Sequence, residues 1–270
     1  MPLYSIKHST RYRYLYPVLV SHHAIYLQPL NLPSQKCREF TLTTDPACTD
    51  YRTRVDYFGN ISGLFSVQEE HQSLLITSQS IVEAYGKAPD LNALPMTCGQ
   101  ATQLFKSGKS IPLEALQHLF GSNRIQRDPP DALREYAQSV FQPDKPLLQG
   151  CLDLMDDLKR NFTFDAEATD VDTSVEDFMK LRRGVCQDFA HFSITVLTAM
   201  GLPAKYVSGY ILSIPPPGKP RLEGADASHA WVSVYLPQHG WVDFDPTNNI
   251  FCSDQHVTLA YGRDFDDVSL

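Results

Sequence analysis

The sequence predicts an α+β protein in which an antiparallel β-sandwich-like domain precedes a core made of a helix packed on an antiparallel sheet. Three features indicate this class. Strand-like segments fill the beginning of the chain, helical patterns interrupted by prolines follow, and the end combines an apolar helical stripe with three strand-like runs. With 270 residues, 43% of them hydrophobic, the chain is long enough for two domains that each bury a core.

Residues 1–88 are expected to form the β domain. Its segments are rich in β-branched and aromatic residues and are separated by Pro, Asn, Asp and Gly, a pattern typical of a sandwich of short strands. The expected strands cover residues 3–14, 24–30, 39–44, 53–57, 63–68 and 74–82.

Two further regions follow the β domain. Prolines divide residues 89–146 into short helical patterns such as 131–141, so we interpret this stretch as a helical connector. Residues 147–270 are expected to form the core. It should begin with helices at 147–161 and 174–181, the second of them opened by a capping box in the Thr-Ser-Val-Glu run that starts at Thr173.

A cysteine stands where a glycine-ended loop meets a strongly apolar helical pattern. The pattern begins at Cys186, and Gly201 and Pro203 end it. The start of a helix carries partial positive charge and unpaired N–H groups, which stabilise a thiolate and can hold an oxyanion. Cys186 is therefore the candidate nucleophile. The remaining cysteines are expected to be free, buried, small hydrophobic residues, namely Cys37, Cys48, Cys98, Cys151 and Cys252.

Three strands are expected after this helix, the first at 204–214. The other two, 229–236 and 241–245, are separated by turn residues and should pair as an antiparallel hairpin. Folding about the turn brings the start of one strand beside the end of the other, so His229 and Asp245 become neighbours.

A helix packed on this hairpin would bring a thiol, an imidazole and a carboxylate together. Cys186, His229 and Asp245 would then act as nucleophile, general base and orienting carboxylate. The side chain of Asp243 is expected on the same face of the strand as that of Asp245, so Asp243 is the alternative candidate for the orienting carboxylate.

These residues resemble the core of the bacterial transglutaminase-like family, a branch of the papain-like cysteine enzymes. The similarity extends to the β-rich N-terminal domain that is usually fused to that core, and so to most of the chain. By this resemblance Cys186 matches the family nucleophile, His229 the base and Asp245 the orienting carboxylate. The matching segments of the core are 164–165, 169–173, 183–191, 201–210, 229–231 and 240–249, and those of the N-terminal domain are 4–14, 17–18 and 56–60.

His191 lies five residues after Cys186, and on a helix that offset turns it away from the thiol. We interpret His191 and Asp188 as residues that pack or hydrogen-bond near the helix start rather than transfer protons. Zinc ligation by Cys186, Asp188, His191 and His229 is a weaker alternative, because no C-x-x-C pair or H-E-x-x-H helix supports it. We expect no metal and no cofactor.

The chain differs from related enzymes in the residues that could donate hydrogen bonds to the oxyanion. Animal transglutaminases are thought to use an upstream indole there, whereas both tryptophans of this chain, Trp231 and Trp241, lie downstream of Cys186. Papain-like proteases use a glutamine six residues before the nucleophile, where this chain has Lys180. The backbone N–H of Cys186 remains a candidate donor, and the sequence does not name a second one.

Composition limits the partners. A formal charge of −8 without a basic stripe disfavours nucleic acid, and we expect no membrane partner, because no run approaches the ~18 apolar residues of a membrane span. No signal-peptide pattern follows Met1, and six cysteines without paired spacing fit a reducing compartment, so we expect a cytoplasmic protein. Oligomeric state is not indicated.

The sequence therefore predicts an enzyme that forms a thioester on Cys186. We expect a cysteine peptidase or amidase acting on a peptide or protein substrate, as the resemblance implies for bacterial relatives with these two domains. The alternatives are a protein-glutamine transglutaminase, in which an amine replaces water, and a noncatalytic peptide-binding scaffold. Retention of all three chemical groups argues against the scaffold.

Overall fold

The computed structural model describes residues 1–108, 111–215, 217–218, 221–224 and 227–269, and these residues form two compact units. Unit 1 contains residues 1–87 and 253–261 together with the end of the chain from Val268. Unit 2 contains residues 88–252 and 262–267. The mixture of helices with antiparallel sheets confirms the predicted α+β class.

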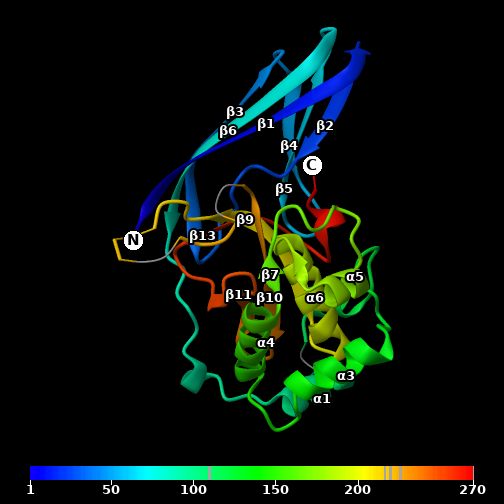
Figure 1. Cartoon of the computed structure of the whole chain (residues 1–270). Coiled ribbons are helices and arrows are strands. Elements are labelled where there is room, and N and C mark those ends of the chain that lie inside the picture. The colour runs from blue at the N-terminus through cyan, green and yellow to red at the C-terminus, as the bar shows by residue number, and fades with distance from the viewer. Residues whose placement is uncertain (109–110, 216, 219–220, 225–226, 270) are drawn as a thin grey trace. The chain divides into compact units, whose positions relative to one another are not determined.

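Unit 1 contains two three-stranded antiparallel sheets, with strand orders β1-β6-β3 and β2-β5-β4 (Figure 1). A cluster of apolar residues that includes Ile25, Phe65 and Leu74 forms its core. Every expected strand is present, although the second ends before Leu27 and Leu30, which are buried outside it. The bounds are β1 Leu3–Val18, β2 Ser21–Ile25, β3 Gln35–Asp45, β4 Thr49–Val55, β5 Ile61–Val67 and β6 His71–Ala84.

Two buried side-chain amides explain why residues 253–261 cluster with unit 1, although we expected them in the core. This segment contains most of β13 (His256–Gly262). Gln35 receives a hydrogen bond from Thr258 N at 2.7 Å and donates one to Thr258 O at 2.8 Å. Asn60 makes the same pair of bonds with Tyr261, both at 2.7 Å. Each amide thus satisfies a backbone donor and acceptor as a neighbouring strand would.

The helices of unit 2 agree closely with the sequence pattern. The expected helix at 147–161 has the same bounds in the structure, and the helix expected at 174–181 begins one residue later. Its cap is Ser174, which accepts a hydrogen bond from Asp177 N at 3.1 Å, so the capping pair lies one residue beyond the expected Thr173 and Glu176. The bounds are α1 Cys98–Ser107, α2 Leu113–Leu116, α3 Asp131–Val140, α4 Leu147–Asn161, α5 Val175–Leu181 and α6 Cys186–Ala199, with 3-10 turns η1 Leu91–Ala93, η2 Gln117–Leu119 and η3 Phe265–Asp267.

The sheet of unit 2 contains the three expected strands. β9 (Ala204–Ile211), β10 (His229–Leu236) and β11 (Gly240–Asp245) are antiparallel neighbours, and β12 (Ile250–Phe251) extends the sheet beyond β11. A two-residue parallel pair, β7 (Thr163–Phe164) with β8 (Arg183–Gly184), gives no sequence signal because it is so short.

Helix α6 is buried on all sides rather than along one stripe. It packs against β9 and β10, and α3 and α5 contact it as well, so residues 188–197 are all buried. Its polar members remain satisfied, because Ser193 and Thr195 each donate to the carbonyl four residues earlier, at 2.8 Å. Among the described residues, no helix is long and apolar enough to cross a membrane.

Candidate active site

The start of α6 is fixed by the carboxylate of Asp188. Its Oδ2 accepts hydrogen bonds from the backbone N–H of Val185 at 2.8 Å and from the Thr169 hydroxyl at 2.7 Å. A side chain at Gly184 would overlap this carboxylate, so the loop can pass over it only with glycine. Burial raises the pKa of Asp188, against the opposing effect of these hydrogen bonds. Asp188 therefore locks the turn that presents Cys186.

Cys186 is the first residue of α6 and is half-buried. The first N–H groups of a helix have no partner within it, and they carry the positive end of the helix dipole. The thiol therefore lies beside backbone N–H groups that can donate to an oxyanion.

The β10–β11 hairpin brings His229 and Asp245 together. In its register Val232 faces Phe244, so His229 reaches diagonally across to Asp245. The His229 Nε2 and Asp245 Oδ2 atoms are 2.8 Å apart, and both side chains are buried. The predicted neighbours are thus in contact.

The Asp245 carboxylate is held by the turn that follows β11. Its Oδ1 accepts from the backbone N–H groups of Thr247 at 3.0 Å and Asn248 at 3.2 Å, and its Oδ2 accepts from Asn248 Nδ2 at 2.7 Å. Asp243, the alternative carboxylate, instead accepts from the indole of Trp231 at 3.2 Å. The hydrogen bonds thus place Asp245, the carboxylate preferred from the hairpin pattern, against His229, and the alternative Asp243 against Trp231.

The imidazole of His229 is electrostatically coupled to both neighbours. Burial by itself would lower the pKa of His229, but the Asp245 carboxylate and the Cys186 side chain outweigh it and raise this pKa to about 10. Because Asp245 occupies Nε2, Nδ1 is the nitrogen left for the thiol. The imidazole is therefore protonated at neutral pH, beside the side chain of Cys186.

A glycine approaches the same imidazole from the loop before β10. Gly224 has φ +80°, and a Cβ placed on it would lie 2.6 Å from His229 Nδ1. Its neighbour Glu223 is tied to Asn248, because the Glu223 N–H donates to Asn248 Oδ1 at 2.7 Å. The loop is thereby joined to the turn that holds Asp245.

His191 contacts other residues than the proposed catalytic ones, as its position on the helix predicts. Its Nε2 accepts a hydrogen bond from Phe265 N at 3.1 Å, and its ring packs on Tyr206. Burial lowers the pKa of His191 to about 3, so the ring is neutral. Within residues 1–108, 111–215, 217–218, 221–224 and 227–269, no group of three or more His, Cys, Asp or Glu residues is placed to hold a metal ion, and this includes the set considered for zinc.

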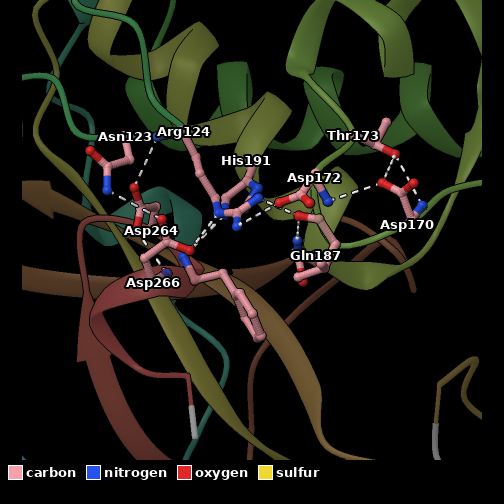
Figure 2. Close-up of polar contacts among 11 residues, drawn as sticks. Asn123, Arg124, Asp170, Asp172, Thr173, Gln187, His191, Asp264 and Asp266 are labelled. Carbon is pink, nitrogen blue, oxygen red and sulfur yellow. Dashed lines mark hydrogen bonds and ion pairs between the residues drawn. The ribbon is translucent and has the colours of Figure 1, made fainter.

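Arg124 organises the segment beside the nucleophile, although nothing in its local sequence suggests this (Figure 2). Its guanidinium contacts Asp266 at 2.7 Å, Asp172 at 3.4 Å and the carbonyl of Val171. The same carbonyl accepts from Gln187 Nε2 at 3.1 Å, and Gln187 follows Cys186 directly. Arg124 therefore links the 170–173 loop, which also carries the Asp170–Thr173 hydrogen bonds, to η3 and to the start of α6.

Two family models match the chain. The bacterial transglutaminase-like N-terminal region matches residues 4–83, and the transglutaminase-like superfamily core matches residues 134–246. The second match contains all three residues of the Cys186, His229 and Asp245 cluster.

The chain is also similar to curated relatives and to a solved structure. An uncharacterized protein of Mycobacterium tuberculosis is 40% identical over 272 residues, covering 98% of this chain and 85% of the relative. A protein-glutamine gamma-glutamyltransferase of Pseudomonas aeruginosa is 36% identical over 91 residues, which are 33% of this chain and 14% of that protein. The crystal structure of a "Putative Cysteine Protease" from Cytophaga hutchinsonii superposes with a TM-score of 0.79 at 22% identity, covering 99% of this chain and 83% of that one.

Proposed function

Because the chain belongs to the transglutaminase-like superfamily and carries the bacterial transglutaminase-like N-terminal region, we propose that it is a cysteine peptidase or amidase that cleaves a peptide or amide bond through a thioester. The observation that carries this proposal is the buried His229–Asp245 pair, 2.8 Å long, coupled to the half-buried Cys186.

The reaction uses each member of the cluster in a separate role. The Cys186 thiolate attacks the carbonyl carbon while His229 holds the thiol proton on Nδ1. The backbone N–H of Cys186 donates to the oxyanion that forms. His229 then gives its proton to the departing nitrogen, the C–N bond breaks and the acyl group remains on sulfur.

The second half of the reaction reverses the proton transfer. Water attacks the thioester while His229 takes its proton, the carboxylic acid departs and the thiolate is restored. Throughout, Asp245 orients the imidazole and stabilises its protonated form. The cycle consumes one water and needs no redox partner.

A second candidate function is amide transfer, in which an amine takes the place of water. The match to the Pseudomonas aeruginosa gamma-glutamyltransferase, which is limited to 91 residues, favours this alternative. Both reactions share the acyl-enzyme, so they differ in the acceptor that the site admits.

We also propose a peptide or protein substrate and a cytoplasmic location, with no metal, nucleic acid or membrane required. All six cysteines are free, which suits a reducing compartment. Burial raises the pKa of Cys98 to about 11 and raises the pKa of Cys151 and Cys252 as well, so these thiols are expected to be inert.

Mass spectrometry tests the proposal in two steps. Brief treatment with iodoacetamide should label Cys186 first, and labelling of Cys98 or Cys252 at the same rate would contradict the activated thiolate. A glutamine-containing peptide is then incubated with and without a competing primary amine. Hydrolysis yields a free acid in both samples, whereas transfer yields an amine adduct. Cys186→Ala should abolish both products, and Cys98→Ala serves as the matched control.

A further inference from the structure

A cavity of about 250 Å³ lies next to the proposed catalytic residues. Ligand pockets for drug-sized molecules usually measure about 300 to 1,000 Å³, so this cavity suits one amino-acid side chain. The residues that shape it come from α4, β7, α6 and the two loops around β10 and β11, and they include Lys159, Phe162, Phe164, Phe189, Glu223 and Thr247.

The walls of this cavity are attached to the groups that carry the chemistry. Phe189 lies in the first turn of α6, three residues after Cys186. Phe164 pairs with Gly184 in the short β7–β8 sheet that leads to the cysteine. On the other side, Thr247 donates its backbone N–H to Asp245. A side chain bound here would belong to a residue that flanks the scissile carbonyl.

The lining is partly aromatic and partly polar, and the two charges at its rim are paired with each other. Phe162, Phe164 and Phe189 provide aromatic surface. Lys159 and Glu223 form an ion pair at 2.6 Å, with side chains 45% and 39% exposed. Because each charge already has a partner, the rim offers no net charge to a charged ligand. A neutral aromatic side chain fits this surface.

One polar group in the lining lacks a partner. Thr247 is 2% exposed, and its hydroxyl makes no hydrogen bond to any residue that the structure describes. A buried hydroxyl without a partner costs free energy, and a ligand atom that bonds to it recovers that cost. The backbone of Thr247 is committed to Asp245, which leaves the side chain for a ligand.

We propose that this cavity is a specificity subsite for a neutral aromatic side chain with a polar end, and that it prefers tyrosine to phenylalanine. The three phenylalanines receive the ring, and the Thr247 hydroxyl bonds to the phenol. The assignment rests on the proposed acyl-transfer function, because it places the tyrosine beside the bond that Cys186 attacks.

Ligand binding can be tested without turnover. Cys186→Ala protein is titrated with N-acetyltyrosinamide, N-acetylphenylalaninamide and N-acetyllysinamide, and the dissociation constants are measured by NMR with signals of the cavity residues. We expect tyrosinamide to bind roughly tenfold tighter than phenylalaninamide, the value of one hydrogen bond, and lysinamide to bind most weakly. Equal binding of tyrosine and phenylalanine, tighter binding of lysine, or shifts confined to other surfaces would overturn the proposal.

Two variants of Thr247 sharpen the result in the same Cys186→Ala background. Thr247→Val keeps the shape but removes the hydroxyl, so the tyrosine preference should disappear. Thr247→Ser keeps the hydroxyl and should keep the preference. Loss of the preference in both variants, or in neither, would count against the hydroxyl contact.

The two hypotheses fail separately. A wild-type protein that forms no acyl-enzyme with any amide, while Cys186→Ala still prefers tyrosinamide, refutes the proposed function and leaves the subsite. A wild-type protein that cleaves peptides without regard to a flanking tyrosine refutes the subsite and leaves the function.

Discussion

Replacing Gly224 by alanine should disable the proposed activity without unfolding the protein. A Cβ at this position would lie 2.6 Å from His229 Nδ1, whereas ordinary contacts begin near 3.4 Å. The imidazole or the loop must therefore move by about 0.8 Å, the difference between these two distances. The loop is anchored by Glu223 to Asn248, so the imidazole should take much of the shift.

The size of the effect follows from this displacement. A misplacement near 1 Å can cost about 10²-fold in rate, so acyl transfer should fall by roughly that factor. Gly224 has a left-handed backbone conformation, so alanine at this position should also lower the free energy of unfolding by about 1 to 2 kcal/mol. Gly218 isolates the two effects, because it has the same φ of +80° but none of the described atoms lies within 4 Å of the point that its Cβ would occupy.

The assay compares Gly224→Ala, Gly218→Ala and wild type by iodoacetamide alkylation of Cys186 at pH 6, by turnover and by thermal melting. Both variants should melt at a similarly lowered temperature. Alkylation of Cys186 should slow by at least about tenfold in Gly224→Ala alone, because the thiolate loses its imidazolium partner. If Gly224→Ala matches Gly218→Ala in alkylation and turnover, the contact between Gly224 and His229 does not constrain the site.

Three other changes test separate parts of the structure. Asp245→Asn should slow turnover by roughly 10²-fold or more, whereas Asp243→Asn, which alters the bond to the Trp231 indole, should slow it much less; the reverse order would require redrawing the cluster with Asp243. His191 is buried, and its pKa is lowered to about 3 in the folded protein. Below about pH 6.5 the unfolded chain therefore binds a proton at this residue that the folded chain excludes. The free energy of unfolding should accordingly fall as the pH drops from about 6.5 toward 3. His191→Gln should reduce this loss by about 2 kcal/mol at pH 5, measured by urea unfolding, and an unchanged pH dependence would contradict the assignment. Arg124→Met should lower the free energy of unfolding by about 2 kcal/mol through loss of charged hydrogen bonds, and Arg124→Lys should recover part of it; equal stability of both variants and wild type would contradict the anchoring role.

The part of the site that follows from short-range patterns was predictable. The glycine-ended loop before an apolar helix placed Cys186 at a helix start, and α6 begins at that residue. The turn residues between two alternating runs predicted the β10–β11 hairpin, which places His229 against Asp245. Both predictions depend on periodicity and turn chemistry within a few residues of each group.

Other features depend on contacts between distant segments, and the sequence gives no signal for them. The hairpin pattern favoured Asp245 over Asp243, but it did not indicate the groups that hold the two carboxylates: Asn248 donates to Asp245, and the Trp231 indole donates to Asp243. The role of Arg124 appears only when loops far apart in the chain meet around its guanidinium. The pattern of apolar and polar residues within each segment does not indicate these long-range contacts.

The His229–Asp245 pair is better explained by chemistry than by stability. Removing an ionised pair from water costs several kcal/mol per charge, and apolar residues of the same size often stabilise a fold more. This pair is nevertheless fully buried, and Thr247 and Asn248 add three hydrogen bonds to the carboxylate. Those donors satisfy the oxygens of Asp245, and this carboxylate in turn raises the pKa of His229 beside the thiol. A fold that needed only a core at this position would have no reason to bury the charge next to Cys186, so the pair is expected to serve proton transfer and to be dispensable for folding.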